Sequence, residues 1–195
     1  MDRKTTLVIV DFQYDFANPQ GSMYVEGAED AEKKILHYLD SHHSEIEEVV
    51  FTLDWHIPTH PSFQSEGGPW PRHCVQYTKG ASVSEPLLTS AWYLGYDCYF
   101  FTKGETEEEY GAFSHINKKI SGVEAFNHSG MCKYDINTNR KYVVCGLALD
   151  YCVKETAKNL KSAGLDVAVY LAGTMSISAD DEAIEELEKH GVEII

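Results

Sequence analysis

The clearest candidate for chemistry in this sequence is Cys152, within the stretch YVVCGLALDYCVKETA at residues 142–157. The stretch begins as a strand-like apolar run, passes through small residues and continues as a helix. This pattern places the thiol on the first turn of the helix, where free N–H groups and a partial positive charge favour a thiolate. Because free cysteines are otherwise mostly buried and inert, the interpretation depends on the neighbours of Cys152.

Two further reactive side chains follow strand-like runs. Asp11 comes directly after the apolar run LVIV, where an unpaired charge is costly, and Lys103 ends the run YDCYFFT. Alone, such an aspartate is more often a cap or turn residue, and such a lysine a surface residue. Beside Cys152, Lys103 would lower the thiol pKa and Asp11 would accept its proton. The backbone N–H groups of Cys152 and Ala148 would then stabilise an oxyanion.

The stretch DWHIPTHPSFQSEGGPWPRHC, residues 54–74, gathers side chains that bind metal ions. Asp54 and His56 lie two residues apart on an extended chain, so both point to one face. His73 returns after a loop that includes Glu66. This set suits one divalent ion, with Zn²⁺ favoured and Fe²⁺ or Mn²⁺ as alternatives. Glu66 is the first candidate for the fourth ligand and His60 the second. His56 and His60 have the i, i+4 spacing of ligands on a helix, but the prolines on both sides of His60 prevent a regular helix there.

Strands and helices alternate along the chain and would position these residues. The sequence predicts strands over 6–12, 47–54, 96–104, 140–146, 166–173 and 192–195, and helices over 28–42, 151–163 and 180–191. Such alternation indicates a doubly wound α/β sheet of parallel strands with crossover helices. Ligands bind beyond the carboxyl ends of the strands in such sheets. Five candidate residues at the strand ends therefore converge at one edge, namely Asp11, Asp54, His56, Lys103 and Cys152. Residues 55–80 and 121–139 resist assignment.

Composition restricts the class of protein. A chain of 195 residues with 43% hydrophobic and 24% charged residues suits a single globular domain over 1–195. The net charge of −15 argues against nucleic acid and anionic membranes as partners. No stretch resembles a signal peptide or approaches the length of a membrane span. Five cysteines without scaffold-like spacing favour reduced thiols, and we therefore expect a cytoplasmic protein.

Several motifs resemble those of nicotinamidases, within the superfamily of isochorismatase-like cysteine hydrolases. They are VIVDFQYDF, DWHIPTHPSF, WPRHC, FTKG and VCGLALDYCVKETA, and they match in order over nearly the whole chain. The resemblance implies a three-layer α/β/α fold with a six-stranded parallel sheet. It also implies a catalytic triad of Asp11, Lys103 and Cys152. Metal-free relatives such as isochorismatases lack the metal-binding pattern that is present here.

The resemblance further implies the roles of individual residues. The metal ligands of the family correspond to Asp54, His56 and His73, with Glu66 at a variable fourth position. A cis peptide would precede the oxyanion-hole residue, between Leu147 and Ala148. Four residues would contact the substrate, namely Phe16, Trp70, Tyr110 and Leu147. Residues 121–139 match no family motif, which leaves the pocket rim on that side and homo-oligomer formation open.

The activity implied by the resemblance is hydrolysis of nicotinamide to nicotinate and ammonia through a cysteine thioester, in NAD salvage. The metal ion would bind the pyridine nitrogen, and pyrazinamide-like analogues would also be substrates. Two alternatives remain open at this point. One is another hydrolase of the superfamily that acts on a different small carboxamide. The other is a non-enzymatic regulator that keeps the fold and binds a metal ion.

Overall fold

The first apolar run forms β1 (Thr5–Val10), in which every residue is buried. In this computed structural model, which describes residues 3–114, 123–178 and 180–195, β1 lies inside the sheet between two parallel neighbours. These are β2 (Ile46–Asp54) and β6 (Lys141–Leu147). A strand covered on both faces needs apolar side chains at successive positions rather than at alternate ones. The continuous run in the sequence reflects this central place.

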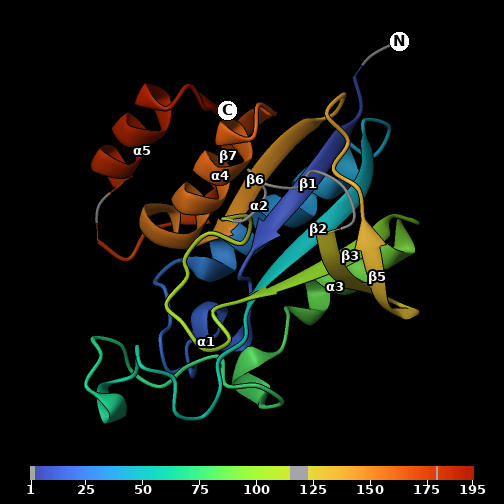
Figure 1. Cartoon of the computed structure of the whole chain (residues 1–195). Helices are drawn as coiled ribbons and strands as arrows, with labels where there is room; N and C mark the ends of the chain where they lie inside the picture. Colours follow the sequence, from blue (N-terminus) through green and yellow to red (C-terminus); the bar gives the residue numbers. More distant parts are fainter. Residues whose placement is uncertain (1–2, 115–122, 179) are drawn as a thin grey trace.

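The sheet continues with β3 (Asp97–Lys103) beside β2, and with β7 (Asp166–Met175) and β8 (Glu193–Ile194) beside β6. The full order is β5-β4-β3-β2-β1-β6-β7-β8 (Figure 1). The strands from β3 to β8 in this order are all parallel, and the doubly wound α/β fold is confirmed. Two strands outside the predicted six-stranded sheet make it eight-stranded and mixed.

The additional strands are β4 (Val123–Asn127) and β5 (Gly130–Tyr134), an antiparallel hairpin within the segment that matched no motif. Gly130 has a φ of 108°, and the Ser129 N–H donates to Asn127 Oδ1 at 2.9 Å, which closes the turn. Ala125 and Tyr134 are buried, whereas Phe126 and Met131 on the opposite face are exposed. The hairpin therefore extends the sheet beyond β3 instead of crossing over it.

Helices cover both faces of the sheet (Figure 1). On one face lie α2 (Ala28–Ser41) and α3 (Glu85–Tyr93), and on the other α4 (Lys154–Ser162) and α5 (Asp180–Lys189). The helix α2 buries its apolar residues at helical spacing, including Ala28, Ala31 and Ile35. Each pair of helices encloses one of the two hydrophobic clusters. Among the described residues, no helix is long and apolar enough to cross a membrane.

Three helical segments differ from the sequence predictions. The predicted helix over 151–163 starts with a π-helical turn, Leu149–Val153, and α4 follows it. The helix α3 was not predicted, nor was the short helix α1 (Tyr14–Ala17). A local signal for α3 does exist, because the Ser84 hydroxyl caps it by accepting the Leu87 N–H at 3.3 Å and a proline occupies the first turn.

Candidate active site

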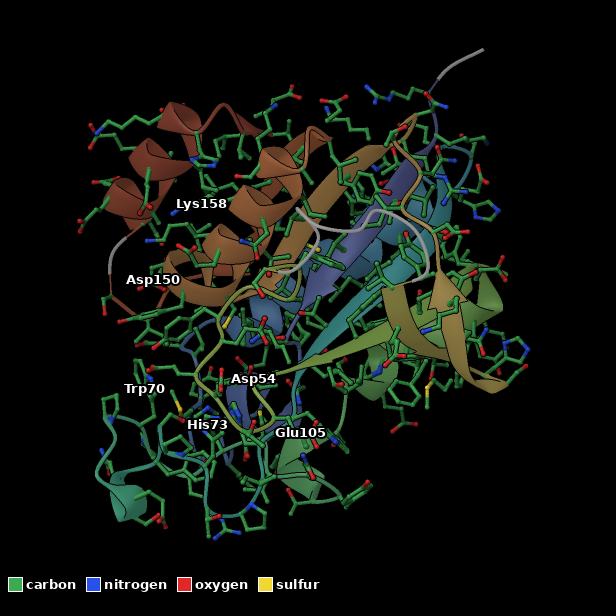
Figure 2. The ribbon with its side chains drawn as sticks, in the orientation of Figure 1. Asp54, Trp70, His73, Glu105, Asp150 and Lys158 are labelled. Atoms are coloured by element: carbon green, nitrogen blue, oxygen red, sulfur yellow. The ribbon has the colours of Figure 1, made fainter. Side chains whose placement is uncertain are left out.

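The predicted reactive residues meet at the carboxyl edge of the sheet. Asp11 follows β1, Asp54 ends β2, Lys103 ends β3 and Cys152 lies in the π-helical turn after β6. The register of β2 and β3 pairs Asp54 with Lys103. All four side chains are buried, with relative exposures from 0% to 7%. Figure 2 shows Asp54 at the ends of the strands, with His73 and Trp70 on the adjoining loop.

The ammonium group of Lys103 connects the charged residues of the site. Its Nζ lies 2.8 Å from Asp11 Oδ2 and 3.5 Å from Cys152 Sγ, and it also donates to Asp54 Oδ1. The Thr52 hydroxyl donates to the other Asp11 oxygen at 2.7 Å. One buried cation therefore faces two carboxylates and the thiol. The sequence predicted the contacts of Lys103 with Asp11 and Cys152, but not its contact with Asp54.

Burial controls the protonation of these groups. Burial raises the pKa of Cys152 well above that of a free thiol, and the opposing effect of Lys103 does not offset it. The expectation that the helix N-terminus and Lys103 favour a resting thiolate is therefore not supported. Burial also raises the pKa of Asp11, against the effect of Lys103. Burial alone would lower the pKa of Lys103, but the two carboxylates raise this pKa well above its usual value. A thiol beside a carboxylate with a raised pKa suits proton transfer between them.

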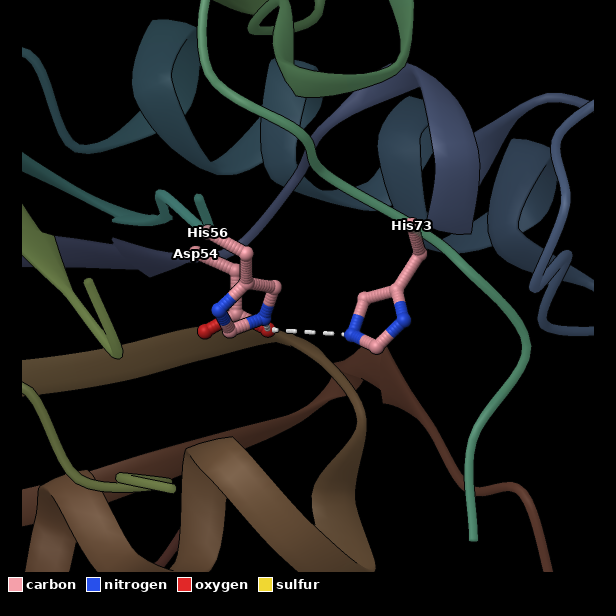
Figure 3. Close-up of side chains that lie close together, drawn as sticks. All are labelled: Asp54, His56 and His73. Atoms are coloured by element: carbon pink, nitrogen blue, oxygen red, sulfur yellow. Dashed lines mark ion pairs between the residues drawn. The ribbon is translucent and has the colours of Figure 1, made fainter. Parts of the chain in front are cut away.

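Asp54, His56 and His73 form a compact group whose ligand atoms all lie within 4.8 Å of one another. Asp54 Oδ2 lies 3.5 Å from His56 Nε2 and 3.9 Å from His73 Nε2 (Figure 3). The Nδ1 atoms of the two rings contact the carbonyl oxygens of Gly104, at 2.5 Å, and Pro71, at 2.6 Å. With each Nδ1 against a carbonyl oxygen, Nε2 is the ring atom of each histidine that faces the group. This is the arrangement that metal-binding histidines adopt.

Local structure fixes the positions of both histidines. The N–H of His56 donates to the Cys74 carbonyl at 3.1 Å, which holds His56 beside the chain that carries His73. Gly104 has a φ of 62°, and a Cβ on it would lie 2.8 Å from the His56 ring. Burial lowers the pKa of His73, so its neutral form is favoured. A carboxylate and two imidazoles are the ligand types that suit a divalent ion such as Zn²⁺.

The structure does not bring Glu66 to this group. Glu66 is exposed on a short 3₁₀ turn, Gln64–Glu66, at the tip of a loop that the bridge between Phe63 and Trp70 closes. His60 is fully buried, and its ring centroid lies 4.2 Å from that of His56. His60 Nδ1 contacts Ser62 Oγ at 2.7 Å, while Nε2 has no hydrogen-bond partner in the described part of the chain. The geometry therefore favours His60 over Glu66.

A pocket connects the thiol with the histidines. All the predicted pocket residues line it, together with Ala148, Cys152, Asp54, His56, His60 and His73. Its aromatic wall is held by a hydrogen bond of 3.2 Å from Trp70 Nε1 to the Tyr110 hydroxyl. The Phe16 ring lies 5.4 Å from the ring of His73. The peptide bond between Leu147 and Ala148 is cis, which confirms that prediction.

Other residues that line the pocket were not predicted, namely Met23, Ser62, Glu108, Glu109, Tyr151 and Ile177. Tyr151 could have been found from the motif, since it precedes Cys152 and its ring lies 5.4 Å from that of Trp70. Ile177 carries no such signal. The Asp150 carboxylate accepts the backbone N–H groups of Ile177, at 3.0 Å, and Ser178, at 2.8 Å. This tertiary contact holds Ile177 at the pocket.

Comparisons with known proteins agree with this architecture. The isochorismatase domain family matches residues 5–195. The nicotinamidase/pyrazinamidase of Mycobacterium tuberculosis is 33% identical, and the match covers 97% of each chain. The pyrazinamidase of Pyrococcus horikoshii, crystallised in complex with zinc, has a TM-score of 0.75 and 28% identity over 98% of each chain. PnC1 of L. infantum, crystallised with nicotinate, has a TM-score of 0.72 and 29% identity, covering 99% of this chain and 92% of the other.

The fold and the family match define the class of the protein as a hydrolase with an isochorismatase-like α/β domain. The chain belongs to the isochorismatase family, and within it to the group of nicotinamidases and pyrazinamidases. The predicted family is thereby confirmed.

Proposed function

We propose that the protein is an amidohydrolase that converts nicotinamide to nicotinate and ammonia, in NAD salvage. The observation that carries this proposal is the buried contact of Lys103 with both Asp11 and Cys152, at one end of an aromatic pocket. The similar proteins from Saccharomyces cerevisiae and Mycobacterium tuberculosis are a nicotinamidase and a nicotinamidase/pyrazinamidase. These relatives support nicotinamide and related carboxamides as the substrate class.

The reaction would proceed through a covalent intermediate. Asp11 accepts the proton of the Cys152 thiol, and the sulfur attacks the carboxamide carbon. The backbone N–H groups of Ala148 and Cys152 donate to the tetrahedral oxyanion, and each such donor contributes about 10²–10³-fold in rate. When the C–N bond breaks, Asp11 returns its proton to the leaving nitrogen, which departs as ammonia. Water then hydrolyses the thioester and releases nicotinate and the thiol.

The side chains at the other end of the pocket would orient the ring. Asp54, His56 and His73, with His60 in place of Glu66 as the proposed fourth ligand, would hold one divalent ion, with Zn²⁺ favoured. When bound, the ion would supply a Lewis acid for the pyridine nitrogen. Phe16 and Trp70 would pack against the planar ring and keep its carboxamide beside the sulfur.

The test is the release of ammonia from nicotinamide by the purified protein, before and after treatment with a chelator and after Zn²⁺ is added back. We expect turnover that falls on chelation and returns with Zn²⁺. A panel of small carboxamides that includes pyrazinamide separates nicotinamide hydrolysis from another amidase activity. If the protein binds Zn²⁺ but releases ammonia from none of these amides, the alternative of a non-enzymatic metal-binding regulator is correct.

The assignment of the fourth ligand leads to a comparison of two variants. We expect His60→Ala to lower Zn²⁺ occupancy after gel filtration and to weaken Zn²⁺ binding at least about 10–100-fold, as loss of a supporting residue does. Glu66→Ala should retain full occupancy, because Glu66 is exposed and does not line the pocket that His60 lines. Zinc content measured by elemental analysis distinguishes the two. Reduced occupancy in Glu66→Ala together with full occupancy in His60→Ala would restore the prediction made from the sequence.

A further inference from the structure

Gln13 is a fully buried polar residue just beyond β1, outside the groups assigned to chemistry. Its side-chain Oε1 accepts the N–H of Asp54 at 2.8 Å. Its Nε2 donates to the carbonyl oxygens of Asp54, at 2.8 Å, and Ala81, at 3.0 Å. The chemistry of these partners fixes the orientation of the amide, since one N–H requires an acceptor and two carbonyls require donors. Gln13 thus engages both backbone polar groups of Asp54.

The end of β1 explains why Asp54 needs this partner. The ladder between β1 and β2 ends where Val10 pairs with Thr52, and the Asp11 N–H then donates to the Thr52 carbonyl at 3.0 Å. Asp11 has a φ of 46°, and the chain turns away from β2. Among the residues that the structure describes, no strand residue therefore lies beside Asp54, two residues beyond Thr52, on that side. The Gln13 amide supplies the acceptor and the donor that a neighbouring strand would otherwise provide.

The position of Asp54 matters because its two carboxylate oxygens serve different groups. Oδ1 accepts from Lys103, the cation beside Cys152. Oδ2 faces Nε2 of His56 and of His73, at 3.5 and 3.9 Å. A displacement of the Asp54 backbone would move both oxygens together, and misplacement by about 1 Å can cost about 10²-fold in rate.

We propose that Gln13 is a positioning residue, which fixes the backbone of Asp54 so that one carboxylate serves both the histidines and Lys103. Gln13 does not touch the pocket and acts through Asp54. The catalytic part of this inference rests on the proposed function. The part that concerns metal affinity does not, because it depends only on the ligand geometry of Asp54, His56 and His73.

Two substitutions test the inference. Gln13→Glu is nearly isosteric and keeps an acceptor for the Asp54 N–H, but it offers the two carbonyl oxygens at most one donor, the O–H of the protonated acid. Gln13→Met has a similar length and loses every hydrogen bond of the amide. We expect both to raise the dissociation constant for Zn²⁺ about 10–100-fold, measured by competition with a chelator. At saturating Zn²⁺, kcat for nicotinamide should fall about 10²-fold, while KM changes little.

The matched control is Thr6→Val. Thr6 is also fully buried, and its hydroxyl donates to Glu48 Oε1 at 2.9 Å, linking the same two strands near their other ends. Thr6→Val should lower the urea midpoint of unfolding, as the Gln13 variants do, because each loses a buried hydrogen bond. It should leave Zn²⁺ affinity and kcat unchanged. If Gln13→Met does not fold, the near-isosteric Gln13→Glu decides the result.

The outcomes separate this inference from the proposed function. If the Gln13 variants unfold at lower urea but keep the Zn²⁺ affinity and kcat of the original protein, Gln13 is only structural and the inference is wrong. If the original protein binds Zn²⁺ but releases no ammonia from nicotinamide, the proposed function fails, and Zn²⁺ affinity alone decides the role of Gln13. If the original protein binds no Zn²⁺, there is no ligand geometry for Gln13 to hold, and the inference fails with the metal site.

Discussion

Cys152→Ala is expected to abolish the release of ammonia from nicotinamide, with a fall in kcat on the order of 10⁶-fold, as for other catalytic nucleophiles. The thiol is buried at the pocket, 3.5 Å from Lys103 Nζ, and its loss removes the atom that would attack the carboxamide. Replacing sulfur with hydrogen leaves the Asp54, His56 and His73 group in place. Zn²⁺ binding and the urea midpoint should therefore remain close to those of the original protein.

The chain offers a matched control in Cys145, a fully buried cysteine on β6. Its Sγ lies 3.7 Å from the Val8 carbonyl oxygen, and burial raises its thiol pKa. Cys145→Ala creates a similar small cavity but removes nothing from the pocket, so kcat should be retained. Ammonia release by Cys152→Ala at a rate comparable with that of Cys145→Ala would show that Cys152 is not the nucleophile.

The sequence was sufficient to predict the parallel sheet because each central strand is covered on both faces. Runs such as LVIV in β1 show this burial directly, without reference to the rest of the fold. The convergence of Asp11, Asp54 and Lys103 then follows from topology, since parallel strands bring their carboxyl ends to one edge. The β4–β5 hairpin could not be predicted in the same way. Its strands are short and half exposed, and their alternation resembles that of a polar loop.

Where the geometry of the site differs from the sequence predictions, the cause is tertiary. Spacing along a proline-rich loop does not tell which side chain points inward. In the structure Glu66 faces solvent on the loop that the bridge between Phe63 and Trp70 closes, and His60, which precedes that loop, is buried. The start of a helix favours a thiolate at Cys152 locally, but the completed fold buries the thiol and raises its pKa. Gln13 was missed because a glutamine after a strand carries no local sign that its amide will replace a strand neighbour.

Lys103→Met is expected to lower both stability and activity, because the ammonium group is the cation between two buried carboxylates. Its Nζ lies 2.8 Å from Asp11 Oδ2 and contacts Asp54 Oδ1, and all three side chains are buried. Methionine fills a similar volume but carries no charge. The two buried carboxylates then have no cation beside them to balance their negative charge. Removing one partner of a buried ion pair typically costs about 3–5 kcal/mol in the free energy of unfolding. Urea unfolding of the chelator-treated protein measures this loss.

A double variant separates the structural role of Lys103 from its role in catalysis. In Lys103→Met/Asp11→Asn, the carboxylate that faced the ammonium becomes a neutral amide, which removes one of the two uncompensated charges. The free energy of unfolding should therefore recover in part, because the desolvation of that charge is no longer required. Ammonia release should not recover, since the amide cannot accept the Cys152 proton and the cation is still missing. Recovery of kcat together with stability would mean that Asp11 and Lys103 only support the fold, and that the proton of Cys152 is transferred by another route.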